Sequence, residues 1–145
     1  MNGIINVYKE RGFTSHDVVA KLRGILHMKK IGHTGTLDPD ATGVLPVCIG
    51  KATKVCGLLT DKDKTYRAVV KLGVITNTED MTGEILAKHP VSVTKEQIEW
   101  AVSKFVGEIE QVPPMYSAIK INGKKLYELA RQGKEVERKA RKVTI

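Results

Sequence analysis

The most informative stretch of this chain is Gly32-His33-Thr34-Gly35-Thr36-Leu37-Asp38-Pro39-Asp40-Ala41-Thr42-Gly43-Val44-Leu45-Pro46. It places three glycines, two prolines and two aspartates between apolar segments, a composition typical of a structured loop rather than of a helix or a strand. A connection of about 15 residues is well above the usual length, and such loops most often bind ligands or carry catalytic groups. The sequence therefore predicts a long functional loop at 32–46.

Asp38 is the residue of this loop with the strongest indication of chemistry. Gly32 and Gly35 before it permit the close approach of a ligand to the backbone, and Ala41 and Gly43 after it leave room beside its carboxylate. An Asp-Pro pair alone is a common turn, so these neighbours carry the argument. Asp38 is thus a candidate functional residue rather than only a turn residue.

The composition is that of an ordinary globular protein with a basic C-terminal end. The chain has 145 residues, 41% hydrophobic and 28% charged, which is enough for one core. Residues 111–145 hold nine Lys and Arg against three acidic residues, and therefore carry most of the net charge of +8. This end is either a surface that faces phosphates or a solvated charged segment.

Several classes of protein are not indicated. There is no apolar stretch of 18 or more residues and no secretion signal pattern at the N-terminus, so we expect a cytoplasmic protein with no membrane contact. Cys48 and Cys56 are expected to be free thiols. Their spacing to the histidines fits no zinc site, and no metal is predicted.

Hydrophobic periodicity predicts interspersed strands and helices. The expected strands span residues 4–8, 66–72, 85–87 and 118–121. The expected helices span residues 15–26, 52–59, 95–109 and 125–132, with caps at Thr14 or Ser15 and at Thr94 with Gln97. Because strands and helices do not alternate strictly, we predict an α+β fold with a mixed, largely antiparallel sheet and flanking helices.

The segment Gly35–Gly43 matches the motif Gly-x-Leu-Asp-Pro-x-Ala-x-Gly without a gap. It resembles the catalytic motif of the tRNA pseudouridine synthase B family, which isomerises the uridine at position 55 in the T loop of tRNA. Further segments of the chain resemble the same family from Gly3 to the last residue, namely Ile4–Val19, Lys64–Tyr66 and Val112–Lys120. The fold that this resemblance implies is the pseudouridine synthase core.

The resemblance implies roles for individual residues. Asp38 is the catalytic carboxylate, Tyr66 is the ring on which the target base stacks, and His33 fills the space that the flipped nucleotide leaves. Gly35, Leu37 and Lys9 complete the expected substrate-binding set. The residues alone leave two alternatives open, namely that Tyr66 is a core side chain and that His33 is a capping residue.

The expected partner is the T stem-loop of tRNA, with no cofactor and no obligatory protein partner. Asp38 attacks ribose C1′, adds to uracil C6 or removes a proton at ribose C2′, and the sequence leaves these three courses open. The expected contacts to phosphates are Lys51, Lys54, Lys64, Lys120, Lys124, Lys125 and Arg131.

In the family the catalytic domain continues beyond the point that matches Ile145. The continuation carries a second tyrosine and the arginine that pairs with the catalytic aspartate, and a small RNA-binding domain follows. Residues 141–145 begin a strand for which the sequence shows no partner. We therefore expect 1–145 to be the N-terminal portion of a catalytic domain, inactive or nearly so alone.

Two other functions fit parts of the sequence. Gly32-His33-Thr34-Gly35 has the Gly-x-x-Gly form of a backbone-clamping RNA-binding loop, which would suit a module without catalysis. That interpretation leaves Asp38 and Tyr66 unexplained. A catalytic subunit that depends on a guide RNA has a similar aspartate loop, although 112–120 resembles the stand-alone tRNA enzyme.

Overall fold

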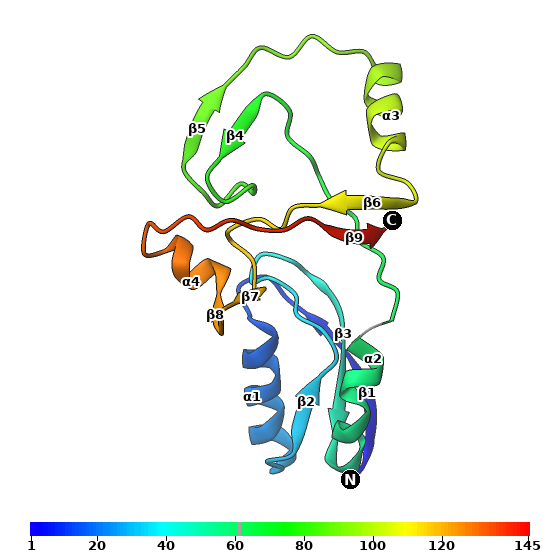
Figure 1. The fold of residues 1–145 in the computed structure, drawn as a ribbon. Coiled ribbons are helices and arrows are strands. Elements are labelled where there is room, and N and C mark those ends of the chain that lie inside the picture. Colours follow the sequence, from blue (N-terminus) through cyan, green and yellow to red (C-terminus); the bar gives the residue numbers. More distant parts are fainter. Residues whose placement is uncertain (61) are drawn as a thin grey trace. The chain divides into compact units, whose positions relative to one another are not determined.

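The computed structural model describes residues 1–60 and 62–145. They form two compact units, Met1–Arg67 and Ala68–Ile145. The strands are distributed over four small antiparallel sheets, one of three strands and three of two (Figure 1). The expected α+β class with antiparallel pairing is confirmed.

The first unit is built on the three-stranded sheet. Its central strand is β3 (Gly43–Ile49), which pairs along its whole length with β1 (Gly3–Lys9) and at its end with β2 (Ile31–His33). The other elements of this unit are the helix α1 (Ser15–Leu26), the 3-10 helix η1 (Gly50–Val55) and the helix α2 (Cys56–Thr60). The strand at 4–8 and the helices at 15–26 and 52–59 are thereby confirmed.

The core of the first unit lies between α1 and one face of the sheet. Strand side chains alternate between faces, so Leu45 and Val47 point to α1 while Val44 points away. Val18 and Val19 of α1 pack against Leu45 and Val47. Leu45 is 1% exposed and Val44 is 64% exposed, which shows that only one face of β3 is covered at this position.

The start of α1 is fixed by a capping box, and Thr14 is the cap of the two candidates that the sequence left open. The Thr14 hydroxyl accepts a hydrogen bond from the backbone of Asp17, and the Asp17 carboxylate accepts one from the backbone of Thr14. The hydrogen bonds that Thr14 donates lower the pKa of Asp17. This cap places Ser15 in the first turn of the helix.

The long loop is shorter than expected, because β2 and β3 take up both of its ends. Only residues 34–42 lack regular structure. Pro46 lies within β3, which the composition argument did not allow. The Pro46 carbonyl accepts a hydrogen bond from the backbone N–H of Thr34 at 3.1 Å. Because the nitrogen and the carbonyl of one strand residue point to the same side, the nitrogen of Pro46 also faces this side. β2 has already ended there at His33, so the missing N–H costs the sheet no ladder hydrogen bond.

The remaining loop is anchored to the start of α1. The Ser15 hydroxyl accepts a hydrogen bond from the backbone N–H of Leu37 at 2.9 Å. The carbonyl of Pro39 accepts one from the backbone N–H of Gly12 at 2.8 Å, and the carbonyl of Asp38 accepts one from Ala41 at 3.0 Å. The peptide groups on both sides of the Asp38 side chain are therefore fixed.

The described part of the second unit consists of three two-stranded sheets and two helices. β4 (Val74–Thr76) pairs with β5 (Ile85–Lys88), β6 (Glu108–Gln111) with β9 (Arg141–Thr144), and β7 (Lys120–Ile121) with β8 (Lys124–Lys125). The helices are α3 (Lys95–Ser103) and α4 (Leu126–Ala130). The capping box of Thr94 and Gln97 at the start of α3 is confirmed.

Two expectations about strands are wrong. Residues 66–72 form no strand, and Tyr66 is 66% exposed rather than on a covered apolar face. The hairpin starts at Val74 instead. The strand at 141–144 does have a partner, β6, about 30 residues earlier in the chain, which the local pattern did not reveal.

Both cysteines are free, as expected. Cys48 is buried in β3 and Cys56 is partly buried at the start of α2. Burial raises the pKa of the Cys48 thiol to about 11, and a hydrogen bond with Cys56 adds to this shift. Within the described parts of the chain, each helix is too short or too polar to cross a membrane.

Replacing Leu45 tests the position of the core. Leu45→Ala removes a side chain that is 1% exposed, and we expect the free energy of unfolding to fall by about 2–5 kcal/mol. Val44→Ala changes the neighbouring exposed residue and should cost less than about 0.5 kcal/mol. Urea denaturation of both variants measures the difference, and equal losses would contradict the assignment of faces.

Replacing Ser15 tests the anchor of the loop. In Ser15→Ala the N–H of Leu37 loses its acceptor, which should cost about 1–3 kcal/mol and speed hydrogen exchange at Leu37. Thr14→Ala is the matched control, because it removes the cap of α1 but leaves the contact to Leu37. Exchange rates measured by NMR should rise selectively at Leu37 only in the first variant. Unchanged exchange there would show that Ser15 does not hold the loop.

Candidate active site

A pocket of about 910 Å³ lies beside the anchored loop, within the first unit. Its volume is in the range of sites that hold small molecules or single nucleosides. It is formed by the loop, by the first half of β3 and by the segment that leads out of α2. Its lining residues are Thr34–Leu37, Asp40–Pro46, Lys62–Arg67, Ile4 and Leu59.

Asp38 is exposed at the tip of a tight turn next to this pocket. Leu37 and Asp40 on either side of it line the pocket, although Asp38 is not itself among the lining residues. The turn has Pro39 at its second position, where the fixed φ of proline suits the geometry. An exposed carboxylate on a fixed turn can approach a ligand that enters from solvent.

Three other predicted substrate-binding residues are brought to the same pocket. Gly35 and Leu37 line it from the loop, and Tyr66 lines it from the segment after α2. The Tyr66 ring is 66% exposed, so one of its faces is available for stacking on a flat ligand. The ring and the loop come from segments about 30 residues apart.

Lys64 also lines this pocket, but its ammonium group is partly engaged. The Nζ atom donates hydrogen bonds to the carbonyls of Thr60 at 2.6 Å and Lys62 at 2.7 Å. These carbonyls lie at and just beyond the end of α2, where a positive charge is favourable. Lys64 therefore adds positive charge to the pocket from a defined position.

Lys9 has a different role from the direct substrate contact that we expected. It is fully buried, and its Nζ atom donates to the carbonyls of Phe13 at 2.7 Å, Glu10 at 3.1 Å and Pro39 at 3.3 Å. An ammonium group has three N–H donors, and here all three are used inside the protein. Lys9 therefore holds the Asp38 turn through the Pro39 carbonyl and has no N–H left for a ligand.

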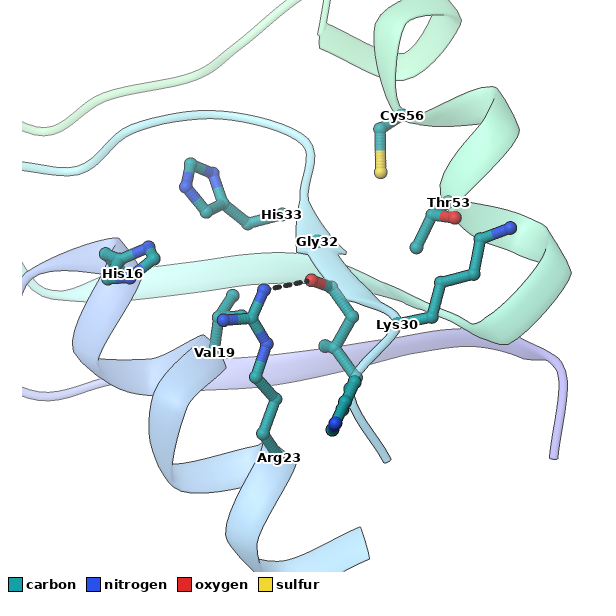
Figure 2. A pocket seen from close by; sticks show the side chains of 10 residues that line it. His16, Val19, Arg23, Lys30, Gly32, His33, Thr53 and Cys56 are labelled. Atoms are coloured by element: carbon teal, nitrogen blue, oxygen red, sulfur yellow. Dashed lines mark hydrogen bonds between the residues drawn. The ribbon is translucent and has the colours of Figure 1, made fainter. Parts of the chain in front are cut away.

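His33 is not part of the pocket beside Asp38. It ends β2 and lines a second, smaller pocket together with His16 and Arg23 of α1 (Figure 2). Thr34, the next residue, lines the first pocket. The Nδ1 atom of His33 is buried and has no hydrogen-bond partner among the described residues.

The predicted phosphate contacts fall into two groups. Lys51 and Lys54 are exposed on η1 in the first unit. In the second unit, the β7–β8 hairpin places Lys120 directly opposite Lys125 and brings Lys124 next to them. Arg131 follows α4, and both Arg131 and Lys125 lie over the Tyr127 ring, at 5.2 and 5.3 Å from its centroid.

Sequence reasoning missed several residues that shape the site. Asp40 forms an ion pair with Arg11 at 2.8 Å, which joins the loop to the segment before α1 and raises the pKa of Arg11. Ser15 was noted as a possible cap, but its hydroxyl acts on the loop. The sequence did contain a signal for this role of Ser15. If Thr14 caps the helix, the Ser15 hydroxyl is free to bind another group.

Lys29 and Lys30 were also missed, and they line the second pocket with Arg23. A pair of lysines directly before the apolar start of a strand is a recognisable signal for a basic edge. No group of three or more His, Cys, Asp or Glu in the described segments is arranged to hold a metal ion.

Comparisons with known proteins identify the family to which this chain is similar. A model of the family "TruB family pseudouridylate synthase (N terminal domain)" matches residues 23–145. The tRNA pseudouridine synthase B of Lachnoclostridium phytofermentans is 70% identical over 145 residues, which cover all of this chain and 47% of that protein. The enzyme of the same name from Alkaliphilus oremlandii is 61% identical, over all of this chain and 48% of that protein.

Solved structures show the same similarity. A chain in the crystal structure of a Cbf5-Nop10-Gar1 complex is 34% identical with a TM-score of 0.56, over 81% of this chain and 31% of that chain. A chain in the structure of an H/ACA RNP bound to a substrate RNA containing 2'-deoxyuridine is 31% identical with a TM-score of 0.51, over 83% of this chain and 34% of that chain. This chain spans about half the length of the curated relatives that it matches. Since the family model covers most of its residues, the chain belongs to the TruB family of pseudouridylate synthases.

Proposed function

We propose that this protein converts uridine to pseudouridine in tRNA, at position 55 of the T loop, with Asp38 as the catalytic carboxylate. The observation that carries the proposal is the Asp38 turn, which Ser15 and Lys9 hold beside a pocket of about 910 Å³. Family membership and the names of the relatives support the reaction and the substrate. Residues 1–145 would be the N-terminal portion of the catalytic domain.

The reaction needs a carboxylate but no cofactor. The bond between uracil N1 and ribose C1′ breaks, the base rotates, and a bond forms between C5 and C1′. The C5 proton is lost and N1 gains a proton, so the reaction is an isomerisation without net redox change. The ionised Asp38 serves as nucleophile at C1′ or C6, or as base at C2′, and each course requires it within reach of one nucleotide.

The pocket fits a nucleotide that has left the stack of the RNA. A base inside a folded RNA is inaccessible, so the target uridine must flip out. The exposed ring of Tyr66 supplies a stacking surface inside the pocket, with Gly35 and Leu37 on the loop side. His33 directly precedes Thr34, which lines this pocket, and its proposed role is to fill the gap that the uridine leaves in the RNA.

The basic side chains supply binding to the RNA backbone. Lys51, Lys54 and Lys64 contribute from the first unit, and the hairpin lysines with Arg131 contribute from the second. Lys120 and Lys125 lie directly opposite each other, and like charges in such a pair destabilise a hairpin unless an anion lies nearby. A T stem-loop of tRNA in the cytoplasm is the substrate that fits, with no membrane and no obligatory protein partner.

The alternatives are less well supported. A binding module without catalysis does not account for the anchored Asp38 turn. A catalytic subunit guided by a separate RNA would fit the likeness to the Cbf5 complex, but identity is 34% there and 70% to a tRNA pseudouridine synthase B. We therefore favour the stand-alone tRNA enzyme.

Asp38→Asn tests the catalytic assignment. The amide keeps the shape of the side chain but is neither a nucleophile nor a base, so the rate should fall by about 10²–10⁴-fold or more while RNA binding is retained. Tritium release from T stem-loop RNA labelled at C5 of uridine measures the rate. The assay uses the 145-residue chain and the same chain fused to the C-terminal half of the Lachnoclostridium phytofermentans relative.

Asp40→Asn is the matched control for this variant. Asp40 lies on the same turn and lines the pocket, but its carboxylate pairs with Arg11 at the surface. Loss of such an exposed pair has a small effect, so activity should stay within a few-fold of the unchanged protein. Equal activity of both variants, or no activity in any chain tested, would contradict the proposed function.

Neutralising the hairpin tests the RNA surface. The triple variant Lys120→Gln, Lys124→Gln and Lys125→Gln should bind the T stem-loop more weakly, and the dependence of log Kd on log salt should become shallower by about 0.9 for each lost phosphate contact. Lys71→Gln, Lys88→Gln and Lys95→Gln together change the charge equally at exposed positions elsewhere in the second unit. Identical salt dependence in the two triple variants would rule out the hairpin as the binding surface.

A further inference from the structure

The second pocket lies in the first unit and has a volume of about 550 Å³. α1 contributes His16, Val19 and Arg23 to its lining. Residues 29–33 form another side, and Thr53 and Cys56 close it. In Figure 2, His16, Arg23 and His33 lie on one side of the pocket, and Lys30 and Thr53 lie on the other.

The lining of this pocket is strongly basic. Arg23, Lys29 and Lys30 carry full positive charges, and no aspartate or glutamate is among the described residues that line it. None of these three cations makes an ion pair within the part of the chain that the structure describes. The nearest acidic residue in sequence, Asp17, is engaged in the capping box of α1. A bound anion would therefore reduce the repulsion among Arg23, Lys29 and Lys30.

Arg23 is held in place over the pocket. One of its terminal nitrogens donates to the carbonyl of Ile31 at 3.2 Å, which fixes the guanidinium against β2 (Figure 2). A guanidinium has five N–H donors, and the others remain for a ligand. A planar fork of this kind suits two oxygens of a phosphate group.

A further feature favours a ligand in this pocket. The buried Nδ1 atom of His33 has no partner in the described structure, and an unpaired buried nitrogen costs free energy that a ligand contact would offset.

We propose that this pocket binds a phosphodiester of the RNA backbone close to the target uridine, with Arg23 and Lys30 as its main contacts. The proposal rests on the proposed function, because the RNA substrate supplies the phosphate. β2 joins the two pockets, and its rise per residue places Ile31 about 10 Å from Thr34. A phosphate in one pocket and a flipped base in the other would thus belong to neighbouring parts of one strand.

A binding cycle with modified RNA tests this directly. T stem-loop RNAs are prepared in which single phosphates around the target uridine are replaced by uncharged methylphosphonates. At one position, the replacement should weaken binding by the unchanged protein by about tenfold or more, as expected for a hydrogen bond to a charged group. The same replacement should have little effect on binding by Arg23→Gln, because the contact is already lost.

Two more variants distinguish the loss of a phosphate contact from a general effect on charge or stability. Lys30→Gln changes the pocket without touching the Ile31 contact and should show coupling to the same or an adjacent phosphate. Lys21→Gln, on an exposed part of the same helix, should show none. The unfolding midpoint of each variant is measured in parallel. If every methylphosphonate weakens binding equally in all proteins, the pocket does not bind a phosphate of the substrate.

The outcome is distinguishable from a failure of the proposed function. Isomerisation that depends on Asp38, without coupling between Arg23 and any phosphate, would overturn the pocket alone. Coupling in the fused chain, without isomerisation by that chain, would support the pocket and overturn the enzyme. Binding of inorganic phosphate to the pocket is measured by its competition with the RNA. If inorganic phosphate binds there but no RNA phosphate shows coupling to Arg23, the proposal is also overturned.

Discussion

A buried ammonium group holds together the part of this molecule on which the site depends. Lys9 ends β1, and its Nζ atom is shared by three backbone carbonyls, two from the segment before α1 and one from the Asp38 turn. Burial of an isolated charge is costly, and the three carbonyl dipoles offset that cost only if the segments stay in place. The geometry of the turn is therefore coupled to the integrity of the first sheet, and the Ser15 hydroxyl adds a second, neutral anchor.

The two pockets of the first unit share this framework. The anchored loop and Tyr66 form the larger pocket, and α1 with residues 29–33 forms the basic one. β2 and the loop are continuous in the chain, so the lining of one pocket ends at His33 and that of the other begins at Thr34. This arrangement suits a polymer substrate, in which a charged backbone gives affinity and orientation while one base enters the site of chemistry.

Much of the local structure could be predicted from the sequence. The caps at Thr14 and Thr94 and the turn at Asn122 and Gly123 depend on hydrogen bonds or backbone angles within a few residues. Asn122 and Gly123 both have positive φ, as the hairpin requires. The Asp38 motif was recognisable for the same reason, since its glycines and prolines act on the local backbone. The basic pocket and the role of Ser15 were not predicted, because their partners lie in other elements.

From the sequence alone, the starts of α1 and α3 and the residues around Asp38 could be recognised, but the helix expected over 95–109 ends at Ser103, and Glu108–Gln111 form β6. The tertiary contacts were needed to show that Lys9 is buried, that Pro46 fits within β3, and that residues 66–72 leave Tyr66 exposed. The physical reason is the range of the interactions. Caps and turns are closed by neighbours in the chain, whereas a strand needs a partner and a buried charge needs several acceptors, and both come from distant residues.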